Sequence, residues 1–193
     1  MSEGDQFDGL AEHVVSHVGP AVKRWTPTED DAGYGVTLHY PEERPLPVVS
    51  AVTNGLRYRP VRSPEPVELI CTLQTGQEPA ALHLVHTAAR YLLRDAEPKP
   101  LAVQDQLIAS DDLLVPRTQI RGLLFGVHPV FRGVSSFAGK GGATVLRYLT
   151  LLPLTASDIR FLTQGDEGPG RQERLWQRWR ADRVEFWDVE RSG

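Results

Sequence analysis

Two histidines and two aspartates are the residues of this chain whose types and spacing come nearest to a metal or acid–base site. His83 and His86 are three positions apart in a stretch with helical periodicity, so both imidazoles could reach one ion. A tetrahedral site would still need two further ligands, and no HExxH motif supplies them. Spacing ties no histidine or glutamate to Asp111 and Asp112. The pattern favours a packed or surface histidine pair and an ordinary turn, with no metal, cofactor or catalytic set expected.

A glycine-rich loop that begins at Gly133 contains a lysine, as phosphate-binding loops do. A P-loop has four residues between its glycines and a serine or threonine after the lysine. Here five residues separate Gly133 from Gly139, and a glycine follows Lys140. The single cysteine, Cys71, lies within a predicted strand, where a buried, unreactive thiol is expected. Neither feature predicts nucleotide binding or nucleophilic catalysis.

Tryptophans alternate with arginines near the C-terminal end of the sequence. Trp176 and Trp179 share one side of a helix predicted at 171–181, which is rich in arginine. Stacking on nucleic-acid bases would need a wider basic groove, and five acidic residues between Glu173 and Glu190 balance much of the charge. The pattern therefore predicts packed tryptophans beside a solvated ionic face.

Composition places the chain among ordinary globular proteins without a disulfide framework. It has 193 residues, a net charge of −4 and one cysteine. The net charge gives no general electrostatic attraction to nucleic acid or to an anionic membrane. The N-terminal sequence MSEGDQFDG lacks the basic and apolar regions of a signal peptide, and no apolar run approaches the roughly 20 residues of a membrane span. We therefore expect one domain over residues 1–193 in a soluble, cytoplasmic protein.

The elements that must position these residues are clearest between residues 144 and 165. Val145–Leu152 has the composition of a buried strand, and Pro153 is expected to end it because proline cannot donate to a sheet ladder. Thr155 is a suitable N-cap for the helix that follows, with Asp158 in its first turn and a glycine at its end. A strand that leads directly into a helix must bury both apolar faces, which predicts a central sheet covered by helices.

The remaining elements follow from hydrophobic periodicity and from the positions of glycine and proline. Helices are predicted at 7–18 and 79–94, and strands at 35–40, 48–56 (closing in an Asn-Gly turn), 67–73, 103–108 and 119–130. The segments 25–35 and 131–143 are predicted to be loops, and Val184–Val189 is a possible edge strand. Helices do not alternate regularly with strands, so we expect an α/β (α+β) fold with a mixed, largely antiparallel central sheet flanked by helices.

Four of these segments, in this order, resemble the suppressor of fused family in its small bacterial form. They are VVSAVTNGLRYRPV (Val48–Val61), VELICTL (Val67–Leu73), IRGLLFGVHPVF (Ile120–Phe131) and YLTLLPLTASDIRFLTQG (Tyr148–Gly165). The resemblance covers about residues 36–165, and its Leu-Pro-Leu-Thr segment followed by an acidic helix start is the most specific part. It implies a mixed sheet with flanking helices and a binding rather than a catalytic role. Bacterial members of the family are taken to be immunity proteins that neutralise a cognate polymorphic toxin.

The leading functional hypothesis is therefore a non-catalytic protein-binding module, namely an immunity protein whose partner is a toxin domain. If that toxin is a basic nuclease, the expected contacts are exposed carboxylates, because complementary charge steers association: Asp30, Asp31, Asp111 and Asp112. One alternative is a hydrolase or metal-dependent enzyme with a cleft that contains His39, His83, His86 or Asp111. Another is a regulatory adaptor that dimerises through an exposed strand at Val184–Val189.

Overall fold

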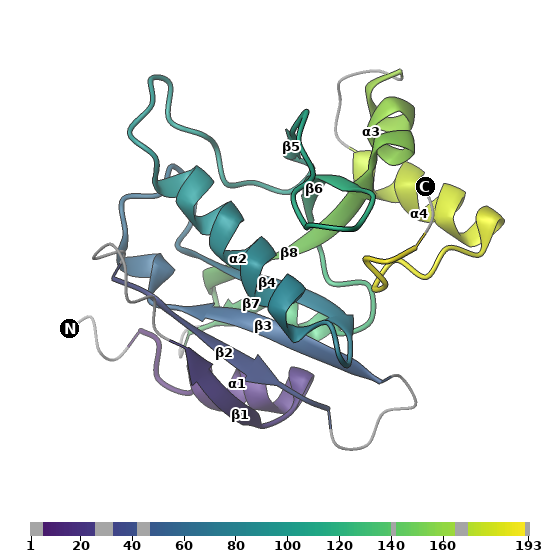
Figure 1. Cartoon of the computed structure of the whole chain (residues 1–193). Coiled ribbons are helices and arrows are strands. Elements are labelled where there is room, and N and C mark those ends of the chain that lie inside the picture. Colours follow the sequence, from purple (N-terminus) through teal and green to yellow (C-terminus); the bar gives the residue numbers. More distant parts are fainter. Residues whose placement is uncertain (1–5, 26–32, 42–46, 140–141, 165–169, 192–193) are drawn as a thin grey trace.

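In the part of the chain that the structure describes, a mixed sheet of eight strands forms the centre of the molecule (Figure 1). The computed structural model describes residues 6–25, 33–41, 47–139, 142–164 and 170–191. The strands are β1 (Ala21–Trp25), β2 (Gly35–His39), β3 (Val48–Asn54), β4 (Val67–Gln74), β5 (Leu107–Ala109), β6 (Ile120–Gly126), β7 (Ser136–Ala138) and β8 (Thr144–Thr155). The helices are α1 (Leu10–Val18), α2 (Glu78–Leu93), α3 (Ala156–Thr163) and α4 (Arg171–Asp182), with short 3-10 turns η2 (Leu56–Tyr58) and η3 (Arg132–Ser135).

The strand order is β1-β2-β3-β4-β8-β6-β5, and β7 pairs with β8 outside this path. Strands β1 to β4 form an antiparallel meander, in which Ala51 of β3 lies opposite Cys71 of β4 as expected for the predicted pair. The junction of β4 with β8 is parallel, whereas β8 pairs with β6 in the antiparallel direction. The predicted fold class, a mixed and largely antiparallel sheet with helices on it, is confirmed.

Helices cover both faces of the sheet (Figure 1). Helix α2 packs on β3 and β4, where Val49, Leu69 and Cys71 are fully buried. Helix α1 and the segment with η3 and β7 form a second apolar cluster with Val52 and Ile70. Successive strand residues point to opposite faces, which is why both sets come from the same strands. Among the described residues, no helix combines the length and apolar character that a membrane crossing requires.

Pro153 does not end its strand, contrary to the sequence-based prediction. It lies inside β8 opposite Leu123 of β6, and its carbonyl accepts a hydrogen bond from Arg191 Nη2 at 2.6 Å. The nitrogen and carbonyl of a strand residue point to the same side, so the proline nitrogen also faces away from β6. The pairing with β4 has already ended at Thr150. Because no strand of the described sheet lies on that side, the missing N–H costs no ladder bond.

The predicted start of α3 is confirmed in detail. The Thr155 hydroxyl accepts a hydrogen bond from the Asp158 N–H at 3.3 Å, and the Asp158 carboxylate accepts one from the Thr155 N–H at 3.0 Å. This reciprocal capping box satisfies two N–H groups that the first turn of a helix would otherwise leave unpaired. Gly165, which was expected to end the helix, lies outside the described residues.

The two chain ends differ from the prediction. β1 was not predicted, since the expected connector began only at Trp25, and all five residues of β1 are exposed, so its sequence shows no alternation of buried and exposed positions. Val184–Val189 is not a strand. Its backbone turns instead, because Arg183 has a φ of 54° and Arg191 Nη1 donates to the carbonyls of Phe186 and Asp188.

Candidate protein-binding groove

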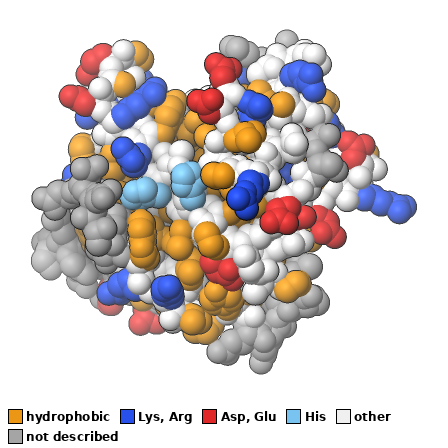
Figure 2. All heavy atoms as spheres, in the orientation of Figure 1, with side chains coloured by type: hydrophobic (Ala, Val, Ile, Leu, Met, Phe, Trp, Pro, Cys, Tyr) orange, Lys and Arg blue, Asp and Glu red, His pale blue; other side chains and the backbone are white. Residues whose placement is uncertain are grey.

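The sheet separates His39 from His83 and His86, which both lie on α2. His83 is exposed on α2, whereas the imidazole of His86 contacts the Tyr34 hydroxyl at 2.7 Å. Figure 2 shows histidine side chains among hydrophobic ones on the face that α2 covers. His39 is buried on the α1 side, between the Gly19 carbonyl at 2.9 Å and the Thr37 hydroxyl at 2.8 Å. Nowhere in the described ranges do three His, Cys, Asp or Glu side chains gather closely enough to hold a metal ion.

Burial gives His39 a pH-dependent effect on stability. Desolvation lowers the pKa of His39 below 6.5, and the hydrogen bond to the Gly19 carbonyl offsets only part of this change. As the pH falls, the unfolded chain therefore takes up the proton before the folded chain does. Neutral His39 contributes fully to the free energy of unfolding above pH 6.5, and this contribution is lost as the pH falls through the pKa of the folded state. We expect the free energy of unfolding of His39→Gln to fall less steeply than that of the wild type between pH 7.5 and 5.5. Urea unfolding at a series of pH values measures this, and equal slopes would contradict it.

The acidic residues expected to contact a basic partner are only partly described. Asp30 and Asp31 lie outside the described residues. Asp111 and Asp112 are exposed in the connection between β5 and β6. Asp111 shares a shallow groove of about 400 Å³ with Arg121 and Arg160, and the Arg121 guanidinium donates to the Asp111 carbonyl. The surroundings of these aspartates are therefore of mixed charge, and both signs are also interspersed over the face in Figure 2.

A different surface has the composition of a binding site. A groove of about 920 Å³ runs along α4, whose lining positions recur every three or four residues and so occupy one face of the helix: Gln172, Glu173, Trp176, Trp179, Arg180 and Arg183. The opposite wall comes from residues 104–105, from 127–130 after β6, and from 184–187 after α4. We call this surface the α4 groove.

Aromatic rings form the middle of the α4 groove. The ring centroid of Trp176 lies 5.1 Å from that of Trp179 and 4.9 Å from that of Phe186, both edge to face. Trp187 contacts Phe186 in the same way at 4.4 Å. Such perpendicular contacts are the favourable arrangement for aromatic pairs. Trp179 is only 2% exposed, whereas Trp176, Phe186 and Trp187 are half-buried and present apolar surface to the groove.

Side-chain amides and carboxylates fix α4 against the end of β6. The Gln172 amide oxygen accepts from the Val127 N–H at 2.9 Å, and its amide nitrogen donates to the Val127 carbonyl at 2.6 Å. The Asp105 carboxylate accepts from the backbone N–H groups of Gly170 and Gln172 at 2.9 and 2.8 Å. A carboxylate at a helix N-terminus satisfies unpaired N–H groups and interacts favourably with the positive end of the helix dipole. These contacts hold the two walls of the α4 groove together at one end.

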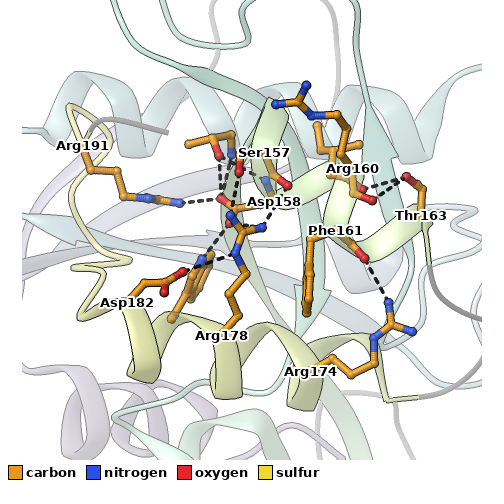
Figure 3. Close-up of polar contacts among 12 residues, drawn as sticks. Ser157, Asp158, Arg160, Phe161, Thr163, Arg174, Arg178, Asp182 and Arg191 are labelled. Atoms are coloured by element: carbon orange, nitrogen blue, oxygen red, sulfur yellow. Dashed lines mark hydrogen bonds and ion pairs between the residues drawn. The ribbon is translucent and has the colours of Figure 1, made fainter.

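Asp158 holds the other end (Figure 3). Its carboxylate accepts from the Trp179 indole N–H at 2.9 Å and lies 3.7 Å from Arg178 and 3.6 Å from Arg191. Arg191 in turn binds carbonyls of the segment after α4 and lies 5.2 Å from the Trp179 ring centroid. The same acid that caps α3 therefore connects α3 to α4 and to the segment that carries Phe186. It fixes the aromatic middle of the groove directly at Trp179 and, through Arg191, at Phe186.

The sequence also matches a family model described as Suppressor of fused protein (SUFU), over residues 33–192. The chain belongs to the suppressor of fused family. The resemblance of its sequence segments to this family is thereby confirmed, and every residue that lines the α4 groove lies within the matched range.

Two solved structures share the suppressor of fused fold with this chain. The crystal structure of the Sufu-Fu complex aligns with a TM-score of 0.66 at 11% identity, and covers 98% of this chain and 91% of that chain. The crystal structure of Drosophila Suppressor of Fused aligns with a TM-score of 0.65 at 10% identity, over 100% of this chain and 53% of that chain. This chain thus spans about half the length of the Drosophila chain. A comparison with curated proteins found no match.

Sequence reasoning found the tryptophans of this suppressor of fused domain but not the groove that they line. Trp179 is packed as predicted, whereas Trp176 is half-buried in the groove wall. The interleaving of tryptophan and arginine over 171–183 was the available signal, since these are the residue types enriched at binding hot spots. Phe186 and Trp187 carried no such signal, because the alternation around them suggested a strand.

Proposed function

We propose that this suppressor of fused domain is a protein-binding module and that the α4 groove receives a segment of its partner. The observation that carries the proposal is the set of half-buried rings of Trp176, Phe186 and Trp187 between exposed charged residues. Protein interfaces concentrate their binding energy in such aromatic centres, and the polar rim excludes water from them. The similar Sufu-Fu structure is that of a complex, which supports a binding role for this chain by analogy.

The more specific role is that of an immunity protein that neutralises a cognate toxin domain. The resemblance of Tyr148–Gly165 and the preceding segments to small bacterial family members supports this role. A protein that acts by occupying a toxin needs a stable body and a fixed contact surface. Both properties agree with a groove whose walls are joined by Asp105, Gln172 and Asp158.

The immunity role predicts that a toxin domain is encoded next to this chain, and co-expression with that domain tests the proposal. The wild-type protein is expected to restore growth and to bind the toxin domain, while Trp176→Ala raises the Kd at least about 10-fold, as hot-spot tryptophans do. Trp25→Ala on β1 is the matched control, because Trp25 is 39% exposed and does not line the groove. Circular dichroism verifies that both variants fold. Growth arrest with the wild-type protein, or an equal loss of affinity in both variants, would contradict the proposal.

Charge reversal tests the contribution of the acidic residues. If the toxin domain is basic, Asp111→Lys with Asp112→Lys is expected to slow association several-fold, most strongly at low ionic strength, because exposed charges act mainly on the encounter rate. The same expectation applies to Asp30→Lys with Asp31→Lys. Asp95→Lys, at an exposed position after α2, is the control. Stopped-flow association rates at two salt concentrations provide the measurement, and unchanged rates would remove these residues from the proposed contact.

A further inference from the structure

The charged residues of the α4 groove are separated by sign along the helix. Asp105 and Glu173 lie at the end where α4 begins, whereas Arg180 and Arg183 lie at the end where it finishes. At 1.5 Å per residue, Glu173 and the two arginines are separated by roughly 10–15 Å along the helix axis. Glu185 also lines the groove near Arg183, so two guanidinium groups and one carboxylate give that end a net positive charge.

The existing contacts leave these charges facing the groove. The Asp105 carboxylate is held by two backbone N–H groups, and Gln177 donates to the exposed Glu173 carboxylate at 3.3 Å. Gln74 donates to the exposed Glu185 carboxylate at 3.2 Å. Neutral amide donors leave the charge of a carboxylate in place. Arg180 and Arg183 are both exposed. The groove therefore has an acidic end, an aromatic middle and a basic end.

The charges of the α4 groove disfavour a nucleic acid or a lipid as its occupant. Three carboxylates face two guanidinium groups in the lining, so a phosphate backbone would meet net repulsion. A lipid chain would have to desolvate charged groups at both ends of the groove. A peptide segment can match both charged ends and still fill the aromatic middle with one side chain.

We infer, on the basis of the proposed function, that the α4 groove binds an extended partner segment with a basic residue and an acidic residue on either side of an apolar one. The basic side chain faces Glu173, the apolar side chain packs on Trp176 and Phe186, and the acidic side chain faces Arg180 and Arg183. An extended chain advances about 3.3 Å per residue, so the two charged residues are about three to five positions apart. In a bound helix the same distance would separate them by about seven to ten positions.

Selection from a phage library of random 12-residue peptides tests this pattern on the full chain. The library is selected on the wild-type protein and depleted on Trp176→Ala. The enriched peptides are expected to carry opposite charges about three to five positions apart with an aromatic or aliphatic residue between them. Absence of enriched peptides, enrichment without this pattern, or a charge spacing of seven to ten positions would overturn the inference.

A charge swap on the selected peptide then assigns the ends. With a synthetic enriched peptide, Glu173→Lys is expected to raise the Kd at least about 5-fold in fluorescence anisotropy, and replacing the basic residue of the peptide by glutamate should recover most of the loss. Glu190→Lys, exposed and outside the groove lining, is the control. An equal loss with the control, or no recovery, would contradict the assignment. Toxin neutralisation is measured separately, so the binding rule and the immunity role can fail independently.

Discussion

Glu68→Gln is expected to lower the free energy of unfolding by about 3–5 kcal/mol, the cost of leaving a buried charge without its partner. Glu68 is fully buried on β4, where its carboxylate accepts from Arg57 Nη1 and from the Thr53 hydroxyl, both at 2.6 Å. It also accepts from the N–H groups of Gly55 and Leu56 at 2.8 and 3.2 Å, which form the turn after β3. Glutamine has nearly the same shape, but its NH₂ group would face donors, and the Arg57 guanidinium would lose its counter-charge.

Urea unfolding followed by circular dichroism measures this loss. Glu65→Gln is the matched control, because Glu65 pairs with Arg147 at the surface, where the two side chains are 36% and 49% exposed. Exposed ion pairs contribute at most about 1 kcal/mol, so the control should unfold close to the wild-type midpoint. Similar midpoints for Glu68→Gln and Glu65→Gln would show that the buried carboxylate of Glu68 contributes no more to the free energy of unfolding than the exposed carboxylate of Glu65.

Asp158→Asn is expected to have the second large effect, a loss of about 3 kcal/mol or more with a local loosening of the segment after α4. The substitution removes the charge between Arg178 and Arg191 and disturbs the capping box with Thr155. Burial already lowers the pKa of the Arg191 guanidinium, an effect that the Asp158 charge opposes. Removing this charge therefore leaves Arg191 to be hydrated, which draws the segment after α4 away from β8.

Two measurements separate local from global effects of this substitution. Tryptophan emission should shift to longer wavelength as the Trp179 indole loses its acceptor, and limited proteolysis should cut within 183–191 before the rest of the chain. Asp182→Asn is the control, since that carboxylate lies 3.5 Å from Arg178 but its side chain is 56% exposed. A control as unstable as Asp158→Asn would mean that Arg178, not the buried acid, holds this region together.

Local chemistry was enough to predict some elements. Thr155 and Asp158 predicted a capped helix because both partners of the capping box are three residues apart and need nothing else. The prediction that Pro153 ends its strand was wrong. The cost of its missing N–H depends on which strand lies beside it, and sequence spacing does not identify that neighbouring strand. β1 was missed for a related reason: its pairing with β2 defines it, while its exposed side chains leave no pattern.

The α4 groove could not be predicted from the sequence because its walls come from distant parts of the chain. Asp105, Val127 and Trp176 line the same space only after β6 has paired with β8 and α4 has docked through Gln172. The tryptophan and arginine types were visible in the sequence, but their exposure was not. The prediction of Asp30, Asp31, Asp111 and Asp112 as contacts rested on charge alone, and their contact with a partner remains a proposal.

The position of β8 has a consequence for how the chain is made. Within the described sheet, β5 and β6 connect to β1–β4 only through β8, which is the last strand in sequence. On the ribosome, the N-terminal meander can close as it emerges, because each of its strands pairs with the next one along the chain. β6 must wait with its backbone edge unpaired and its apolar side chains uncovered until Thr155 has left the exit tunnel. The nascent chain is therefore most in need of a chaperone between the synthesis of β6 and that of β8.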